Sequence, residues 1–131
     1  MNQYLFIYGT LIPDIAPDEI SGAARKLEYI GEGFVYGKLY DLGDYPAAVL
    51  NSNSKVFGRI YKLPDDENIL PELDEYEGYD PQNLSESLYL RKKAKVYLNG
   101  RTLSCWIYEY NQDTSKTPLI ESGNFLTIQT T

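Results

Sequence analysis

The chain has 131 residues and fits one domain, 1–131, because each of two domains would have too thin a core. A formal net charge of −7, from 12 basic and 19 acidic side chains, disfavours nucleic acid and anionic membrane surfaces as partners. The chain has no histidine, which excludes nucleophile–histidine pairs and histidine-ligated metal sites, and its single cysteine excludes an internal disulfide. Acid/base chemistry must therefore fall to a carboxylate, a tyrosine, a lysine or a terminus.

The first predicted element is a buried strand over 4–8, an aromatic and β-branched run that ends at Gly9. No charged region or cleavage signal precedes this run, and it is far too short to span a bilayer. We therefore expect a cytoplasmic protein with no membrane partner.

Turn signals and alternating runs follow the first strand. A loop with two prolines leads to a short helix near 18–24. The segment 28–42 alternates polar and apolar residues around three glycines, which fits two strands or one long bent strand. Two further strands, 47–50 and 56–63, are predicted on either side of a polar turn at 51–54.

The clearest helix is predicted between Pro64 and Gly78. Proline fits a first helical turn, the three acids after it complement the positive end of the helix dipole, and glycine is a typical terminator. After a polar loop, alternating runs over 88–98 and 102–110 flank Asn99-Gly100. Asn-Gly is the strongest short-range signal for a β-hairpin, because both turn residues need a positive φ.

The predicted elements are thus about six strands and one main helix, joined mostly by short turns. This count disfavours a doubly wound parallel sheet. We expect an α+β fold in which a small mixed β-barrel, closed or nearly closed, carries the helix on its outside. Closure would remove the exposed strand edges.

One acid of the predicted helix points toward the core. At about 100° per residue, the apolar side chains share one arc, formed by Ile69, Leu70 and Leu73. Glu77 falls in the middle of that arc and Asp74 at its margin, whereas Glu72 and Glu75 point well away. A carboxylate facing an apolar interior near the negative end of a helix dipole should have a raised pKa, which suits a general acid/base. The alternative is that the helix frays at Gly78 and Glu77 reaches water.

A second candidate site is the segment Tyr8, Gly9, Thr10 and Leu11, where a buried strand ends in a glycine. Glycine lets a ligand approach the main chain closely, and free N–H groups after it can form a nest for a carboxylate or an oxyanion. An ordinary turn after a strand would have the same sequence.

The hairpin also contains side chains with chemical potential. Cys105 alternates with apolar neighbours opposite Ala94, and we expect a buried core thiol instead of a nucleophile. Tyr89 and Arg91 share one face of the hairpin, opposite Tyr110 and Tyr108 on the second strand. This arrangement predicts either a cross-strand aromatic and cation–π cluster or the wall of a pocket.

Together, these elements resemble the gamma-glutamylcyclotransferase-like family, and especially its short gamma-glutamylamine cyclotransferase branch. The family's elements are Tyr-Gly-(Ser/Thr)-Leu, Tyr-Pro-Ala, Leu-Asp-x-x-Glu-Gly, Tyr-x-Arg and a Gly-Asp-Trp ending. They are matched in the same order by Tyr8 to Leu11, Tyr45 to Ala47, Leu73 to Gly78, Tyr89 with Arg91, and Gly123 to Phe125, the last with Asn and Phe substituted. Four ordered elements between residue 4 and about residue 110 are much more specific than any one of them.

The resemblance implies an enzyme that releases an amine from a gamma-glutamyl compound and leaves 5-oxoproline. It implies Glu77 as the catalytic acid/base, the N–H groups of Gly9 to Leu11 as the holder of the substrate carboxylate or the oxyanion, and Tyr8 and Tyr89 as pocket walls. Because the α-amine of the substrate is the nucleophile, no cofactor and no metal is required. The expected partner is a small-molecule gamma-glutamyl substrate, and we expect a monomer or a weak dimer.

Two alternative functions fit the same residues. The first is a catalytically silent barrel that binds a small acidic ligand in the same pocket. The second is a hydrolase that pairs Glu77 with Asp74 or Asp80. The sequence does not identify the amine side of the substrate.

Overall fold

The computed structural model of the chain describes residues 2–9 and 16–125. In those residues the chain forms five strands, two α-helices and one short 3-10 turn. The elements are β1 (Tyr4–Ile7), α1 (Asp18–Ala24), β2 (Glu28–Asp41), β3 (Pro46–Lys62), α2 (Ile69–Glu77), η1 (Leu84–Glu86), β4 (Tyr89–Leu98) and β5 (Arg101–Tyr110).

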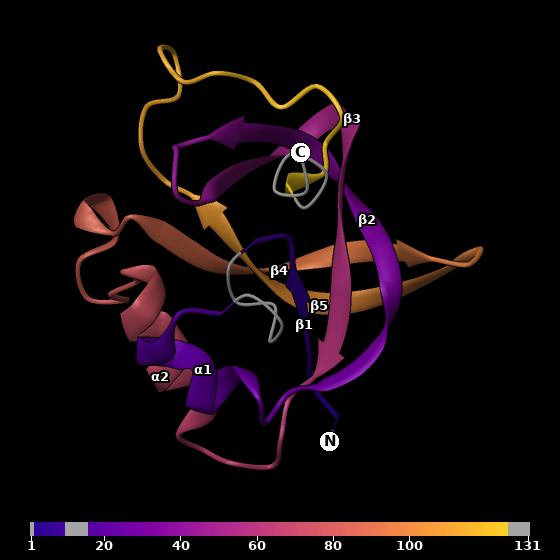
Figure 1. The fold of residues 1–131 in the computed structure, drawn as a ribbon, viewed down its shortest axis with the longest axis vertical. Helices are drawn as coiled ribbons and strands as arrows, with labels where there is room; N and C mark the ends of the chain where they lie inside the picture. The colour runs from indigo at the N-terminus through magenta and orange to yellow at the C-terminus, as the bar shows by residue number, and fades with distance from the viewer. Residues whose placement is uncertain (1, 10–15, 126–131) are drawn as a thin grey trace.

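The five strands close into a barrel in the order β1-β3-β2-β4-β5. The barrel is mixed, because β1 pairs with β5 in parallel through Leu5 and Trp106 while the other neighbours are antiparallel. Both α-helices lie next to each other on one side of the barrel (Figure 1). The predicted α+β mixed barrel is confirmed, with five described strands in place of about six.

The difference in strand count arises in β3. The prediction divided this segment into two strands with a turn at 51–54, but the structure has one strand from 46 to 62. Leu50 pairs with Gly37 of β2 and Lys55 pairs with Tyr36, so the four polar residues between them bulge out of the ladder without ending the strand. Asn51, with φ 66°, starts this bulge. The partner strand β2 is the single long strand of the two alternatives predicted for 28–42.

The main helix is shorter than predicted and begins at Ile69 instead of near Pro64. Pro71 explains the shift. In a helix that began at 65, Pro71 would be an interior residue, where its ring clashes with the carbonyl of the residue four positions earlier. In the observed helix Pro71 lies in the first turn, where its missing N–H removes no helical bond.

The predicted β-hairpin is confirmed together with its register. Asn99 and Gly100 have φ of 48° and 78°, as the tight turn requires. Ala94 pairs with Cys105, as the register in the sequence indicated. The short helix predicted near 18–24 is also present, as α1.

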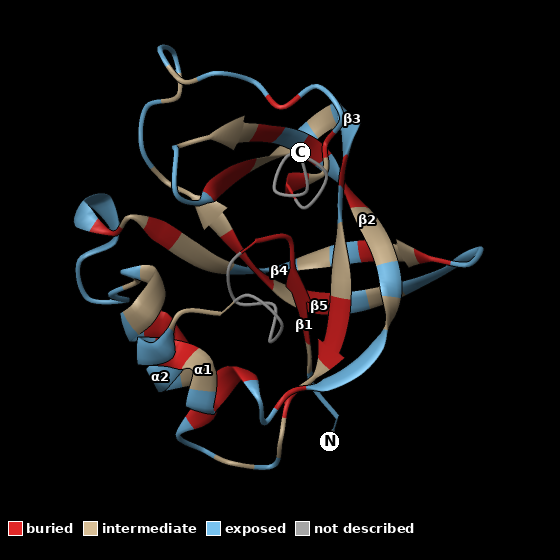
Figure 2. Cartoon of the chain, in the orientation of Figure 1, coloured by how far each residue is buried: buried red, intermediate tan, exposed pale blue. Residues whose placement is uncertain are grey.

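The buried side chains form two clusters. Figure 2 marks the buried residues in red, among them those of β1. One cluster fills the barrel interior, and the C-terminal part of the described chain contributes Ile120 and Phe125 to it. The other lies between the barrel wall and the helices, and includes Ile20 of α1 with Ile69 and Leu73 of α2. The helices are therefore fixed to the barrel by apolar packing, which positions the end of α2 over the end of β1.

Among the described residues, neither helix has the length and the apolar character that crossing a membrane would require.

Candidate active site

The main pocket lies where the end of β1 meets the segment before β3, the start of β4 and the two helices. Its volume of about 580 Å³ is in the usual range for a small-molecule site. Every predicted site residue that the structure describes lines this pocket, namely Tyr8, Gly9, Glu77 and Tyr89. Thr10 and Leu11 lie outside the described residues, so their predicted role stays a prediction.

Glu77 is the last residue of α2 and faces the pocket, as the helical periodicity predicted. Burial raises the pKa of its carboxyl to about 8. No hydrogen bond or ion pair within the described part of the chain offsets this cost of burial. A carboxyl with such a pKa exchanges a proton readily near neutral pH. This rise has the direction that the sequence predicts, and the catalytic role of Glu77 stays a prediction.

The direction of Glu77 depends on how α2 ends. Gly78 has φ 71°, in the left-handed region, and its N–H donates to the carbonyl of Glu75 at 3.2 Å. The N–H of Tyr79 donates to the carbonyl of Asp74 at 2.9 Å, and the carbonyl of Gly78 accepts the N–H of Leu88 at 2.9 Å. The residues after Glu77 are therefore hydrogen-bonded both to the last turn of α2 and to Leu88. Glu77 does not lie on a frayed turn.

Gly9 is required by close packing at the other side of the pocket. A Cβ atom on Gly9 would lie 2.6 Å from Cγ of Pro46, well inside contact distance. The end of β1 and the Tyr45-Pro46 element therefore approach each other more closely than any side chain would allow. Two of the motifs that carry the family resemblance meet here, one from each side of the pocket.

The hydroxyl groups of the pocket tyrosines are bonded to the backbone. Tyr8 donates to the carbonyl of Tyr108 at 2.5 Å and accepts the N–H of Ala48 at 3.3 Å. Tyr89 donates to the carbonyl of Pro46 at 2.6 Å. Burial raises the pKa of both hydroxyls well above the ordinary range, so both stay protonated.

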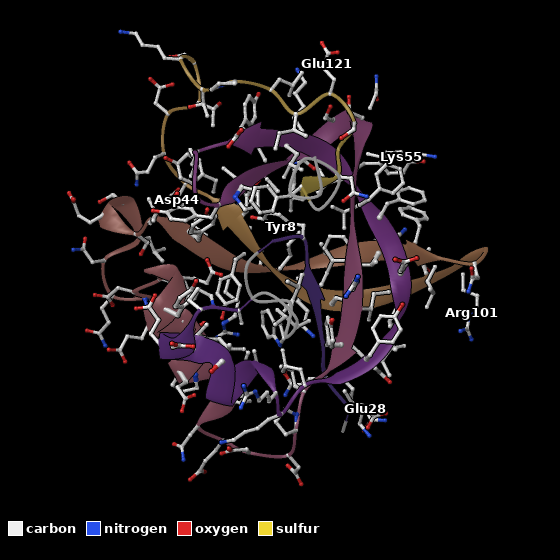
Figure 3. All side chains as sticks on the ribbon, in the orientation of Figure 1. Tyr8, Glu28, Asp44, Lys55, Arg101 and Glu121 are labelled. Carbon is white, nitrogen blue, oxygen red and sulfur yellow. The ribbon has the colours of Figure 1, made fainter. Side chains whose placement is uncertain are left out.

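Figure 3 shows Tyr8 in the middle of the molecule, whereas the labelled Glu28, Lys55 and Arg101 lie at its periphery. Tyr8 and Tyr89 thus form fixed, neutral walls of the pocket.

Sequence reasoning placed Asp74 only at the margin of the apolar arc and missed its partners. Asp74 is 9% exposed and binds Arg91 through two contacts, 2.8 Å from Nε to Oδ1 and 3.2 Å from Nη2 to Oδ2. The hydroxyl of Tyr108 also donates to Oδ1 at 2.7 Å. Tyr108 itself lines the pocket. The shared face of Arg91 and Tyr108 was visible in the sequence, but nothing there indicated that Asp74 would dock on it.

The exposed part of the pocket lining is acidic. Glu72 and Glu75 point away from the apolar core, as predicted, yet both line the pocket together with Glu19 of α1. Tyr45 and Tyr76 complete this part of the wall. Among the described residues that line the pocket, none is a lysine or an arginine. The periodicity of one helix could not reveal this lining, because it combines residues from separate elements.

Groupings of three or more carboxylates or thiols that could hold a metal ion do not occur in the described ranges. Cys105 is fully buried in the barrel interior, and burial raises the pKa of its thiol to about 12. It is the core thiol that the alternation predicted.

The fold and the motifs agree with the comparison to known proteins. A sequence profile for the family described as gamma-glutamyl cyclotransferase, AIG2-like, matches residues 5–127. The chain belongs to the AIG2-like gamma-glutamyl cyclotransferase family. The family resemblance predicted from the ordered motifs is confirmed.

Three relatives illustrate this membership. The gamma-glutamylcyclotransferase family protein ytfP of Citrobacter rodentium is 30% identical over 123 residues, which is 93% of this chain and 94% of the relative. The solution structure of ytfP from Escherichia coli has a TM-score of 0.67 at 27% identity, over 97% of this chain and 99% of that one. YkqA from Bacillus subtilis has a TM-score of 0.73 at 23% identity over 98% of this chain, which spans only 41% of the length of YkqA.

Membership supports a cyclotransferase-like enzyme at the level of the family. In this family member, the pocket brings together the end of β1 with Gly9, two tyrosine walls and the half-buried carboxylate of Glu77.

Proposed function

We propose that this chain is a gamma-glutamylamine cyclotransferase that releases an amine from a gamma-glutamyl amine and leaves 5-oxoproline. Glu77 is its general acid/base. The observation that carries the proposal is the Glu77 carboxyl, whose pKa burial raises to about 8, in the wall of a small-molecule pocket that the end of β1 also lines. Family membership supports the reaction class.

The reaction needs one group that moves a proton twice. The α-ammonium of the substrate loses a proton to the Glu77 carboxylate, and the neutral amine then attacks the substrate's own γ-carbonyl. When the C–N bond to the leaving amine breaks, Glu77 gives this proton to the departing nitrogen. The second proton on the new ring nitrogen then passes through the Glu77 carboxylate to the released amine, which leaves as an ammonium ion and completes 5-oxoproline. The ring closes within one molecule, so holding the folded conformer supplies much of the rate. A single carboxyl of raised pKa suffices, which explains how a chain without histidine performs acyl transfer.

The other described groups of the wall support this assignment to Glu77. The hydroxyl protons of Tyr8, Tyr89 and Tyr108 are each donated to an acceptor of the protein. Burial raises the pKa of all three hydroxyls above the physiological range. These side chains therefore shape the pocket and exclude water, and the proton passes through Glu77. The predicted role of the N–H groups of Gly9, Thr10 and Leu11 is to hold the substrate carboxylate or the oxyanion.

The acidic lining favours an amine as the leaving group over an amino acid or a peptide. A leaving group with a free carboxylate would lie among Glu19, Glu72 and Glu75 without a described cation in the lining. These negative charges repel a carboxylate on the leaving group, whereas a neutral or positively charged amine meets no such repulsion.

The hydrolase alternative requires a second carboxylate beside Glu77. Asp74 is bound to Arg91 and Tyr108, and Asp80 is exposed and accepts the N–H of Gln82 at 3.0 Å. Neither acid lines the pocket beside Glu77. The silent binding barrel remains an outcome of the experiment.

The test is to incubate the protein with a panel of gamma-glutamyl amines in water labelled with oxygen-18 and to identify the products. The proposal predicts 5-oxoproline without label and an equal amount of amine. Glutamate with solvent oxygen would instead identify the hydrolase. Thermal stabilisation by the substrates without any product would identify the silent barrel. Either of those two results contradicts the proposal.

A further inference from the structure

Asp74, which lies about one helical turn before Glu77 in α2, forms an ion pair with Arg91 of β4. The two guanidinium contacts, at 2.8 and 3.2 Å, join both carboxylate oxygens to one planar group. Tyr108 donates to the same carboxylate at 2.7 Å. Bidentate contacts of this kind fix orientation as well as distance. The pair therefore fastens the last turn of α2 to the outer face of the β4–β5 hairpin.

The backbone of Asp74 is fixed as firmly as its side chain. Its carbonyl accepts the N–H of Tyr79, and this hydrogen bond joins the residue three positions before Glu77 to the residue two positions after it. Three and four residues separate neighbours on one helix face, and Asp74 and Glu77 are three apart. A displacement of Asp74 would consequently displace the Glu77 carboxyl in the pocket.

Arg91 is itself held between aromatic rings. Its guanidinium carbon lies 4.4 Å from the ring centroid of Trp106 and 5.7 Å from that of Tyr79. The indole N–H of Trp106 donates to Gln3 at 2.7 Å, which fixes the ring. A planar guanidinium can stack and bind a carboxylate with two N–H groups simultaneously, which an ammonium group cannot do.

The charge of the pair matters because none of the described residues in the pocket wall around Glu77 is a lysine or an arginine. The carboxylates in that wall are Glu19 of α1 and Glu72 and Glu75 of α2. The remaining titratable groups are tyrosines from the barrel strands, the segment before β3 and α2: Tyr8, Tyr45, Tyr76, Tyr89 and Tyr108. Without Arg91, the charge of Asp74 would be added to this acidic environment at a distance of one turn.

We propose that the Asp74–Arg91 pair positions Glu77, by fixing the end of α2 on the hairpin and by cancelling the charge of Asp74 next to the proton-transferring carboxyl. Asp74 and Arg91 are positioning residues, because neither one lines the pocket. The proposal rests on the proposed role of Glu77 in the reaction.

The two halves of the pair can be removed separately, with opposite expected effects. In Asp74→Asn the positive charge of Arg91 is left alone, so the pKa of Glu77 should fall by about one unit. In Arg91→Met the negative charge of Asp74 is left alone, so the pKa of Glu77 should rise by a similar amount. If the ion pair only stabilised the fold, the two variants would not shift the pKa of Glu77 in opposite directions. The readout is the carbon-13 NMR titration of the Glu77 carboxyl, assigned with Glu77→Gln.

Activity provides the second readout. Both variants should lower kcat about 10- to 100-fold, because a displacement of around 1 Å in the reacting geometry has this effect, while KM changes little. Lys93→Met is the matched control. Lys93 lies on the same strand and contacts Trp106 at 4.4 Å, but it does not bind Asp74, so both readouts should stay at the wild-type values.

Arg91→Lys covers the case in which a variant does not fold. It keeps the positive charge and loses the planar contacts, so it should leave the Glu77 titration in place and still lower kcat. Shifts of the same sign in Asp74→Asn and Arg91→Met, or no shift in the folded variants, would overturn the proposal. The NMR titration needs no substrate. If the wild type formed no 5-oxoproline, the proposed function would be refuted, and the titration would still test whether the Asp74–Arg91 pair sets the pKa of Glu77.

Discussion

At the scale of the residue, the chemistry of Glu77 follows from its surroundings. The side chain belongs to the most common acid/base residue class in this chain, and burial alone raises its pKa to about 8. The same burial is a cost to the folded state, because the half-buried charged form has lost part of its water and no hydrogen bond or ion pair with a described residue offsets that loss. Activity and stability should therefore both depend on pH through this one group.

The first prediction concerns rate. Glu77 must be deprotonated to accept the substrate's proton, so kcat/KM should rise about tenfold per pH unit below pH 8 and level off above it. Steady-state kinetics between pH 5.5 and 9.5 (a range of about four units) would measure this profile. The titration of the substrate's own amine, followed separately by NMR, is the control. A profile that follows the substrate amine alone would contradict the role of Glu77.

The second prediction concerns stability. The folded pKa of Glu77 is raised above that of the unfolded chain, so between these two values the folded state binds more protons and stability falls as pH rises to about 8. Glu77→Gln removes this dependence. We expect it to be more stable than the wild type at pH 8 by about 1–3 kcal/mol, and to differ little near pH 4. Urea unfolding at both pH values measures the difference, and equal stabilities at pH 8 would contradict the burial of the charge.

At the scale of the element, the position of Glu77 is a property of the end of α2. The periodicity that selected Glu77 is local, and one helix suffices to predict which of its acids faces the core. The start of the helix was predicted wrongly because the first-turn signal of Pro64 was given more weight than the interior conflict at Pro71. The hydrogen bonds of Arg91 and Tyr108 to Asp74 could not be predicted from the helix alone. Both donors come from the β4–β5 hairpin, whose position against α2 depends on the whole fold.

The third prediction tests the helix end. In Gly78→Ala, the left-handed φ of 71° is strained and the new Cβ lies 3.2 Å from Cβ of Leu88. We expect a loss of about 1 kcal/mol in the free energy of unfolding and a lower kcat, because Glu77 is the preceding residue.

The matched control for this substitution is Gly22→Ala in α1. No atom lies within 4 Å of a Cβ at Gly22, and alanine should stabilise the helix by about 0.5–1 kcal/mol without affecting kcat. Urea unfolding and steady-state kinetics compare the two variants. Equal effects at both glycines would contradict the importance of the helix end.

At the scale of the whole molecule, closure of the barrel brings the site together. The hairpin and its register could be predicted, because Asn99-Gly100 is a local signal. The parallel pairing of β1 with β5, and the bonds of Tyr8 to Tyr108 and of Tyr89 to Pro46, join distant parts of the chain through backbone carbonyls. Every residue has a backbone carbonyl, so the sequence does not show which carbonyl a tyrosine hydroxyl will bind. The sequence patterns therefore left two alternatives for the hairpin tyrosines, a cross-strand aromatic cluster or the wall of a pocket.

The fourth prediction tests how the barrel interior is completed. Phe125, near the end of the described chain, is fully buried in the interior cluster. Phe125→Ala should lower the free energy of unfolding by about 3–5 kcal/mol through the cavity that it leaves. Leu119→Ala is the control, because Leu119 is 47% exposed and its truncation should change stability by less than about 0.5 kcal/mol. Urea unfolding compares both variants, and a small effect at Phe125 would contradict its role in the core.

In the proposed reaction, the single carboxyl of Glu77 carries the proton transfer of an intramolecular cyclisation. The most direct test of this role is the yield of 5-oxoproline from a gamma-glutamyl amine with the wild type, Glu77→Gln and Glu67→Gln. Glu67 is an exposed acid just before the same helix and lies outside the described pocket lining. We predict that Glu67→Gln retains the wild-type rate and that Glu77→Gln loses about 10²- to 10⁴-fold. Equal 5-oxoproline from Glu77→Gln and the wild type would contradict the account.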